Sequence, residues 1–294
     1  TGFFADFIED RFAGAPVFRQ TAEFLGEVLL EPALRNGAFL PDVVSGERLN
    51  LENTIAARIN DKRTWATSEL LRVMCAGEAY GVPRLGELED VRALDEKNLY
   101  AHYRALLTHS QVEIFYMGSH TPDAAAEAFR EALRDLPRGE LTPCGTVVVP
   151  KADAVRKEER ALDVTQGKLV LGFRTGCTLT DAEFPALLMM NAIYGGGITS
   201  KLFMKVREEL SLCYYAMSTL EKFKGVMLVS SGIDCAQRDV AQAEILRQLD
   251  AVRAGDISDY EFESARRYLR SSLSTGMDSP GRLDDFYIGQ LIAG

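Results

Sequence analysis

The feature that most constrains the fold is the order of short apolar strands and amphipathic helices after residue 155. Two strands are predicted at 161–164 and 168–173, and two more at 212–220 and 226–231, the last pair joined by a turn at Lys224-Gly225. Helices are predicted between and after these pairs, over 184–194, 199–210, 235–253, 259–273 and 280–294. The first and the fourth of these follow capping-box patterns, at Thr180–Glu183 and Ser258–Glu261. This order predicts an α+β domain, with helices packed on an antiparallel-rich sheet.

The chain before residue 137 is rich in predicted helices and poor in strands. Helical spacing covers 17–30, 43–75 with a break at Asn60-Asp61, 95–107 and 121–136, and the one predicted strand is 112–117. Asp95 and Thr121 are the predicted N-caps of the last two helices. Proline and glycine then recur over 137–154, as in a linker. We therefore expect 1–136 to be the C-terminal part of a first domain whose sheet precedes Thr1, and 155–294 to be a second, related domain.

Composition excludes some classes of function. The formal net charge is -10, with no block of like charges, so a nucleic-acid or anionic-membrane partner is not expected. No stretch approaches the roughly 20 apolar residues that cross a bilayer. The five cysteines are widely spaced and form no C-x-x-C pair, which indicates reduced thiols and a cytoplasmic protein.

Common catalytic motifs are absent from the sequence. The three histidines, His102, His109 and His120, are never four residues apart, so neither H-E-x-x-H nor H-x-x-E-H occurs. There is also no G-x-S-x-G nucleophile turn and no phosphate-binding G-x-x-x-x-G-K-[ST] loop. We expect each histidine to be a surface or boundary residue and this chain to hold no metal or cofactor.

The segment from Gly195 to Tyr215 reads GGGITSKLFMKVREELSLCYY. It resembles the C-terminal-domain signature of the pitrilysin/insulinase-like (inverzincin) peptidases, a family related to mitochondrial processing peptidase. That signature is a glycine-rich turn, a helix with Ser-[RK]-Leu-Phe and an Arg-Glu pair, and Leu-x-Tyr entering a strand. The matching positions are Gly195, Gly196, Gly197, Ser200, Lys201, Leu202, Phe203, Arg207, Glu208, Leu212 and Tyr214.

The resemblance implies a role for two of these residues in binding substrate. In such peptidases the arginine and the tyrosine reach across a chamber toward peptide bound at the zinc of the N-terminal domain. A guanidinium and a phenol hydroxyl can hold a peptide carbonyl and its developing oxyanion. The resemblance carries that role to Arg207 and Tyr214, with Gly195, Gly196 and Gly197 as the supporting turn. Spacing alone, without the resemblance, favours Arg207 as a solvated helix residue and Tyr214 as a half-buried strand residue.

The resemblance also implies a degenerate zinc-site helix. In the family the H-x-x-E-H motif lies upstream, followed roughly 70 to 80 residues later by a third ligand, a glutamate on a helix. An accessory glutamate precedes that ligand by seven positions; here Glu47 matches it, and Thr54 takes the place of the ligand. A neutral hydroxyl is a poor zinc ligand. A shift in register makes Glu52 the alternative ligand, on another side of the helix.

Three hypotheses follow from the resemblance. The first is a bacterial pseudoenzyme: a non-catalytic subunit that helps to bind peptide and pairs with an active, zinc-bearing subunit of the family, as a heterodimer or with a second copy as a homodimer. The second is a fragment of an active zinc-dependent endopeptidase, with zinc in the full-length protein. The third is a structural subunit without peptide binding, like the core subunits of respiratory complexes.

Overall fold

The chain divides into two compact units. The computed structural model describes residues 2–143 and 145–293. One unit comprises Thr1–Ile55 with Glu87–Cys144, and the other Ala56–Gly86 with Gly145–Gly294. The mixture of helices with small antiparallel sheets confirms the α+β class. The second unit takes in residues 56–86 as well as the chain after the linker, and the domain boundary at 137–154 stays a prediction.

The first unit is largely helical. Its helices and its two short paired strands are α1 (Asp10–Ala13), α2 (Val17–Leu30), β1 (Leu34–Arg35), β2 (Ala38–Phe39), α3 (Pro41–Ala57), α5 (Leu88–Arg92), α6 (Glu96–His109) and α7 (Pro122–Ala132). Helix α3 runs on into the second unit at its last residues. Local signals set several of these ends, since Asp95 caps α6 and Thr121 caps α7 with Pro122 in the first turn.

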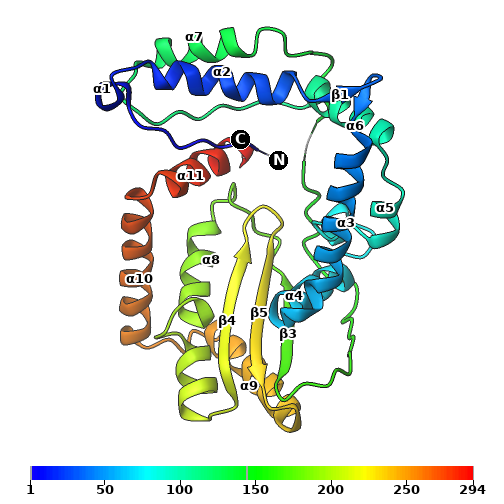
Figure 1. Ribbon diagram of the computed structural model, residues 1–294. Coiled ribbons are helices and arrows are strands. Elements are labelled where there is room, and N and C mark those ends of the chain that lie inside the picture. Colours follow the sequence, from blue (N-terminus) through cyan, green and yellow to red (C-terminus); the bar gives the residue numbers. More distant parts are fainter. Residues whose placement is uncertain (1, 144, 294) are drawn as a thin grey trace. The chain divides into compact units, whose positions relative to one another are not determined.

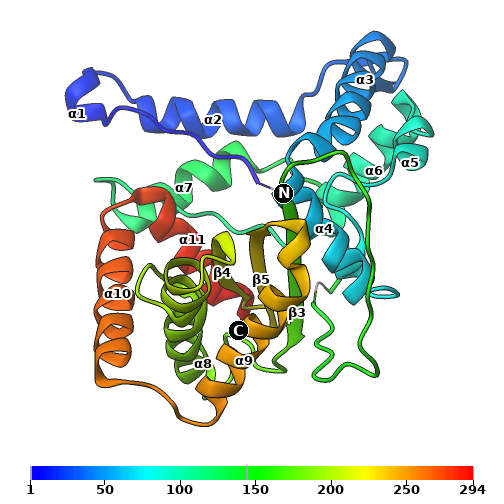
Figure 2. The ribbon, with the colours of Figure 1, turned by 90° about the horizontal axis from the view of Figure 1, so that it is seen from below.

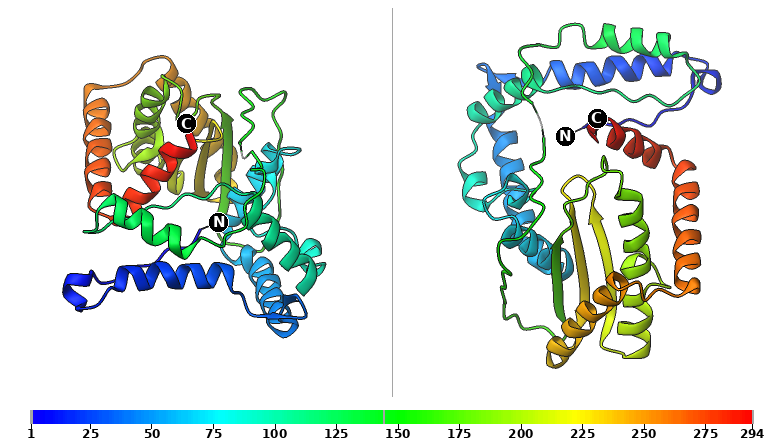
Figure 3. Two further views of the ribbon diagram at one scale, coloured as in Figure 1. Left: turned by 90° about the horizontal axis from the view of Figure 1, so that it is seen from above. Right: turned by 180° about the vertical axis from the view of Figure 1, so that it is seen from behind.

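Helices α2 and α7 lie side by side in the first unit (Figure 1, Figure 3). A Cβ on Gly26 of α2 would lie 2.4 Å from the carbonyl oxygen of Ala132, so only glycine permits this approach. The Phe18 ring packs 4.6 Å from Tyr116 and 4.7 Å from His120. The predicted strand at 112–117 is wrong: the segment has no strand partner in the described part of this unit, and its Tyr116 packs on Phe18 instead.

The second unit contains a three-stranded sheet and the helices around it. Its elements are η1 (Arg58–Asn60), α4 (Lys62–Met74), η2 (Ala79–Gly81), β3 (Gly167–Arg174), α8 (Phe184–Asn191), the π-helical segments η3 (Ala192–Gly196) and η4 (Leu202–Glu209), β4 (Cys213–Glu221), β5 (Val226–Ile233), η5 (Cys235–Gln237), α9 (Arg238–Arg253), α10 (Asp259–Met277) and α11 (Pro280–Ala293). No helix in the described ranges is long and apolar enough to cross a membrane.

Strand β5 is the centre of the sheet, antiparallel to β3 on one side and to β4 on the other. Val229 of β5 is opposite Leu171 and Ser218 and is fully buried. The strands predicted at 168–173, 212–220 and 226–231 are thereby confirmed. Helix α9 lies against the sheet (Figure 2). On this face Val229 joins a core with residues of η4 and α9, namely Leu202, Val206, Ala241 and Ile245.

Two sequence predictions for this unit differ from the structure. The segment 161–164 forms no strand and pairs with no other described segment. The capping box predicted at Thr180–Glu183 is also not formed, because Asp181 instead accepts hydrogen bonds from the backbone and hydroxyl of Thr178, at 2.6 and 2.8 Å. The second predicted capping box, between Ser258 and Glu261, is confirmed at the start of α10.

Helix α4 packs on the other face of the sheet. Just after this helix, Glu78 forms a buried cluster of charges with residues of the sheet region. A Cβ on Gly172 of β3 would lie 2.5 Å from the sulfur of Met74. The carboxylate of Glu78 accepts hydrogen bonds from Arg174 of β3 and from Lys224, whose side chains are 6% and 1% exposed. Lys224 also donates to the carbonyl of Val147. The hydrogen bond from Arg174, aided by the one from Lys224, outweighs the effect of burial and lowers the pKa of Glu78 to about 2.

The charge on Glu78 makes stability depend on pH. Because the pKa of this carboxyl is depressed in the folded state, its contribution is complete above the ordinary value of 4.5 and is lost as the pH falls toward about 2. We expect Glu78→Gln to lower the free energy of unfolding at pH 7 by about 3 kcal/mol, and by much less at pH 3. Urea titrations at both pH values measure this difference.

Glu209→Gln is the matched control, because the Glu209 carboxylate forms an exposed i,i+4 ion pair with Lys205 at 2.5 Å. This change should alter the free energy of unfolding by less than about 0.5 kcal/mol. An equal loss in Glu78→Gln at pH 3 and pH 7 would contradict the electrostatic account of Glu78.

Candidate functional site

The glycine turn packs directly against the sheet. A Cβ on Gly195 would lie 2.6 Å from the hydroxyl and 2.7 Å from the backbone nitrogen of Ser218 in β4. The Ser218 hydroxyl donates to the side chain of Asn191 at 2.7 Å in this buried contact. The neighbouring Tyr194 is fully buried and donates to the carbonyl of Ile245 in α9 at 3.0 Å. The turn therefore fixes the start of the motif helix η4 relative to both β4 and α9.

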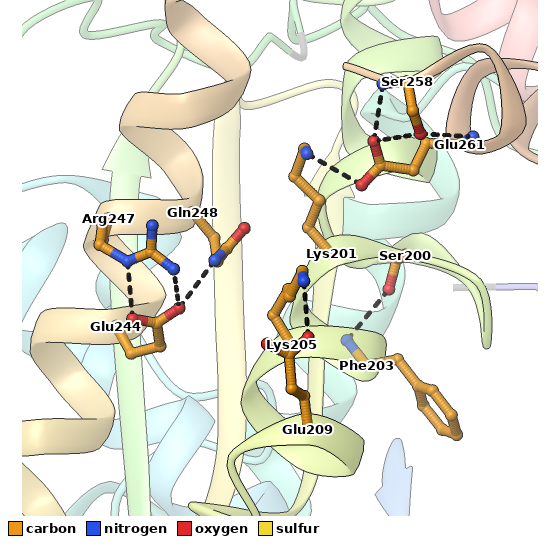
Figure 4. Close-up of polar contacts among 10 residues, drawn as sticks. All are labelled: Ser200, Lys201, Phe203, Lys205, Glu209, Glu244, Arg247, Gln248, Ser258 and Glu261. Atoms are coloured by element: carbon orange, nitrogen blue, oxygen red, sulfur yellow. Dashed lines mark hydrogen bonds and ion pairs between the residues drawn. The ribbon is translucent and has the colours of Figure 1, made fainter. Parts of the chain in front are cut away.

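The Ser-Lys-Leu part of the motif holds η4 in place. Ser200 accepts a hydrogen bond from the backbone nitrogen of Phe203 at 3.4 Å, and Leu202 lies fully buried in the core. Lys201 turns to α10 and pairs with Glu261 at 2.8 Å, with the two side chains 7% and 17% exposed (Figure 4). A buried ammonium needs such a partner, so Lys201 has a structural role.

Glu261 connects this ion pair to a helix cap. Its other carboxylate oxygen accepts hydrogen bonds from the backbone nitrogen and the hydroxyl of Ser258, each at 2.8 Å (Figure 4). Burial acts to raise the pKa of Glu261, but the hydrogen bonds from Lys201 and Ser258 outweigh it, and the pKa is lowered. The carboxylate stays charged near neutral pH and ties the motif helix to the first turn of α10.

Arg207 lies near the end of η4, on its partly exposed side. Its guanidinium carbon is 4.6 Å from the centre of the Phe203 ring, in a cation–π contact. One guanidinium nitrogen is 3.2 Å from the carboxylate of Glu208, and both side chains are substantially exposed. Such a surface ion pair is weak, so most of the guanidinium donors stay available to a ligand.

Tyr214 is exposed because the strand is irregular at that residue. Ser211 has a φ of 51°, which turns the chain sharply between η4 and β4. Cys213 is opposite Ile233 of β5 and Tyr215 is opposite Gly232, so Tyr214 is the extra residue of a β-bulge. The side chain of Tyr214 is 65% exposed, although both Cys213 and Ala216 are buried.

The charge of Arg207 acts at the same end of β4. Burial raises the pKa of the Cys213 thiol, and the positive charge of Arg207 partly opposes that rise. The two candidate residues lie on either side of the turn from η4 to β4, as a fixed cation and a neutral hydroxyl, both able to donate hydrogen bonds to a carbonyl oxygen.

The degenerate zinc-site helix is α3, in the first unit. Glu47 and Thr54 are seven residues apart, so they lie on one face, and both side chains are exposed. The hydroxyl of Thr54 donates to the carbonyl of Asn50 at 2.8 Å. The alternative ligand Glu52 is 3.9 Å from Arg48 and 3.6 Å from Arg92, so its charge is already balanced by two guanidinium groups.

The described residues do not fit a zinc site of their own. No group of three or more histidine, cysteine, aspartate or glutamate side chains in the described ranges could hold a metal ion. His102 and His109 are exposed, and His109 contacts the carbonyl of Glu140 through Nδ1 at 2.8 Å. His120 is half-buried and lies 3.2 Å from the carboxylate of Asp10.

Sequence reasoning missed two parts of this site. The bulge at Tyr214 has no local signal, because the pairing of β4 with β5 creates it. The partner of Lys201 was also missed, although the capping box at Ser258 had already placed Glu261 at the start of a helix. The motif residues that looked alike in the sequence therefore divide into a buried supporting group and the exposed pair Arg207 and Tyr214.

Three comparisons with known proteins place this geometry in context. The family described as "Peptidase M16 inactive domain" matches residues 93–269. The chain is 32% identical over 282 residues to "Probable inactive metalloprotease YmfF" of Bacillus subtilis, a match that covers 95% of this chain and 65% of that protein. It is 25% identical over 256 residues to "Uncharacterized zinc protease ML0855" of Mycobacterium leprae, covering 85% of this chain and 57% of that protein.

A solved structure agrees with the sequence matches. A conserved protein from Enterococcus faecalis V583 superposes with a TM-score of 0.86 at 28% identity, covering 97% of this chain and 68% of that one. The chain thus spans 65% and 57% of the two curated relatives named above.

Gly195 allows a direct test of the packing beneath the site. We expect Gly195→Ala to lower the free energy of unfolding by about 1–3 kcal/mol, because its methyl group would overlap Ser218 and Leu202. Gly276→Ala is the matched control, since Gly276 lies in α10 with no atom within 4 Å of an added Cβ. Alanine there should stabilise the chain by up to about 1 kcal/mol. Urea unfolding measures the change in the free energy of unfolding for each variant. Equal changes in the two variants would contradict the packing account of Gly195.

Proposed function

This chain belongs to the M16 peptidase family and matches its inactive domain, and we propose that it is a non-catalytic subunit that helps to bind peptide. In this proposal it pairs with an active, zinc-bearing subunit of the same family. The chain corresponds to about two thirds of the relative from Bacillus subtilis, so the assembly and the substrate of the whole protein are part of the proposal. A homodimer is the alternative assembly.

The observation that carries this proposal is the exposed position of Tyr214, across the turn between η4 and β4 from the partly exposed Arg207. A tyrosine at the entry of a buried strand would ordinarily pack into the core, whereas the bulge leaves this one 65% exposed. Bulges of this kind often re-aim a side chain at a functional site. Arg207 and Tyr214 would donate hydrogen bonds to a backbone carbonyl of the peptide and, as cleavage proceeds at the zinc of the partner, to the oxyanion.

The chemistry of α3 supports the absence of activity from this chain alone. Thr54 stands at the position of the ligand and uses its hydroxyl within its own helix. Glu52, which the alternative of a complete peptidase requires as a ligand, is paired with Arg48 and Arg92. Zinc coordination by Glu52 would break both ion pairs and leave the two guanidinium groups without a carboxylate.

The division of labour can be tested by cleavage kinetics. The chain is mixed with an H-x-x-E-H-bearing relative encoded in the same genome, and kcat/KM is measured on a fluorogenic peptide. We expect Arg207→Ala or Tyr214→Phe to lower kcat/KM of the pair by about a hundredfold, because each removes a donor to the oxyanion. The relative alone should be less active than the pair.

Matched controls separate this effect from changes in the surface. Tyr260 is 64% exposed in α10, almost as much as Tyr214, and Arg253 is an exposed arginine at the end of α9. Tyr260→Phe and Arg253→Ala should leave kcat/KM within about twofold of the unmodified pair. If Arg207→Ala and Tyr214→Phe behave like these controls, the two residues do not act on peptide and the proposed role is wrong.

The metal content of the full-length protein tests the competing hypothesis of a complete peptidase. Elemental analysis of the protein purified alone should find less than about a tenth of an equivalent of zinc, because a site lacking a carboxylate ligand binds the ion poorly. The same preparation should not cleave peptide. About one equivalent of zinc with chelator-sensitive cleavage would sink the proposal of a silent subunit.

A further inference from the structure

A glycine in the central strand leaves a gap on the face of the sheet that α4 covers. Strand β5 lies between β3 and β4 (Figure 1), and its buried Gly232 is opposite Lys168 of β3 on one side and Tyr215 of β4 on the other. A glycine inside a strand has no side chain to pack, and it often marks a place where another group approaches closely. The proposed function assigns no role to this row of three residues.

The ring of Tyr215 fills the gap over Gly232. A Cβ on Gly232 would lie 2.6 Å from Cε1 and 2.9 Å from Cδ1 of that ring. The hydroxyl of Tyr215 is 3.3 Å from the hydroxyl of Ser230, which is two residues before Gly232 and on the same face of β5. The ring therefore lies along the central strand, at a distance that only glycine permits.

Two cationic groups contact the same ring. The guanidinium carbon of Arg63 in α4 is 4.4 Å from the ring centre, and the ammonium nitrogen of Lys168 is 5.7 Å from it. Both distances are within the range of a cation–π contact. Arg63 also donates to the sulfur of Met217, two residues after Tyr215 in β4. Helix α4 and strand β3 thus hold the Tyr215 ring on this face of the sheet.

The place of Tyr215 decides which of two adjacent tyrosines is exposed. Cys213 and Ala216 both lie in the core on the other face of the sheet. In an unbroken strand two residues three positions apart lie on opposite faces, so one residue between them must leave the ladder. Because Tyr215 is opposite Gly232 and its ring is held there, Tyr214 is the residue that leaves.

We propose that Tyr215 is a positioning residue for the candidate site. Its ring, packed on Gly232 and held by Arg63, keeps the bulge at Tyr214 and directs that side chain outward. Without the ring, a shift of one residue would bring Tyr214 into the empty place over Gly232. The consequence for cleavage rests on the proposed function, whereas the direction of the Tyr214 side chain can be observed in the free protein.

Fluorine NMR of the free full-length protein, with 3-fluorotyrosine at position 214 only, reports the direction of this side chain. We expect Tyr215→Ala and Gly232→Ala each to shift or split the fluorine signal. Tyr215→Phe, which keeps the ring, should leave it in place. Gly172→Ala is the matched control, because its Cβ would lie 2.5 Å from the sulfur of Met74 on the same face, four residues along β3 from Lys168. It should also leave the signal in place.

The contact between the ring and Gly232 can be tested by unfolding in urea. Gly232→Ala should lower the midpoint, because the added methyl group meets the ring. In a protein that already carries Tyr215→Ala, the same change should lower the midpoint by less than about half as much, because the atoms that it meets are gone. Equal shifts in the two backgrounds would overturn the placement of the ring.

Cleavage by the pair with the H-x-x-E-H-bearing relative measures the consequence for function. We expect Tyr215→Ala to lower kcat/KM by about tenfold, mainly through kcat, because a displaced hydroxyl no longer reaches the oxyanion. Tyr215→Phe should stay within about threefold of the unmodified pair, and Gly172→Ala within about twofold. In a Tyr214→Phe background, Tyr215→Ala should have no further effect on kcat/KM. An undiminished loss in that background would contradict a role that acts through Tyr214.

Other results would also overturn the inference. One is a Tyr214 signal that neither Tyr215→Ala nor Gly232→Ala changes, and another is an equal change caused by Gly172→Ala, which would indicate a general loss of packing. If the signal moves as expected while Tyr214→Phe leaves cleavage unchanged, the positioning role stands and the proposed function fails. If Gly232→Ala does not fold by circular dichroism, Tyr215→Ala, which adds no atoms to the sheet, decides the question.

Discussion

The second unit depends on the burial of β5 between its two neighbours. Its backbone groups are satisfied by β3 on one side and β4 on the other, and its side chains are covered on both faces. The motif helix can pack closely on one face because Gly195 lets the chain approach Ser218. On the other face, the Glu78 carboxylate balances Lys224 immediately before β5 begins. The candidate site takes its position from this central strand.

Irregular backbone occurs where the family motif lies. Residues 192–196 and 202–209 are π-helical, Ser211 adopts a left-handed conformation, and Tyr214 bulges from β4. π-Helical turns and bulges are less stable than regular structure and are frequent at functional sites. Here each irregularity has a neighbour that holds it in place, and the most direct is the ion pair between Lys201 and Glu261. The exposed position of Tyr214 is therefore built into the fold and does not result from a loose end of the strand.

The buried ion pairs of Lys201 with Glu261, and of Lys224 and Arg174 with Glu78, show how charge sets position in this protein. Burying an ammonium group is costly, and a single carboxylate partner recovers only part of that cost. Such pairs add little stability over apolar residues of similar volume, but they disfavour any packing in which a charge lacks its partner. Lys201 can be buried only with α10 beside it, and Lys224 only with Glu78 beside it. Helices far apart in the sequence are thereby held at one place on the sheet.

The sequence by itself determined what depends on neighbouring residues. The caps at Asp95, Thr121 and Ser258 form as predicted, because a side chain and the first turn of its helix are only a few residues apart. The strands that became β3, β4 and β5 were readable from their apolar runs, and the family from the motif between Gly195 and Tyr215. The threonine in place of the ligand glutamate, Thr54, was likewise visible in the sequence. That this replacement prevents zinc binding stays part of the proposal.

Only the tertiary structure decided which predicted strands pair and which side chains are free. The segments 112–117 and 161–164 have strand-like composition, but a strand is stable only against a partner, and none reaches them in the described ranges. The bulge that exposes Tyr214 exists only in the register of β4 with β5, and the partner of Lys201 lies 60 residues further along the chain. These features depend on contacts between distant segments, and no local pattern of residues encodes them.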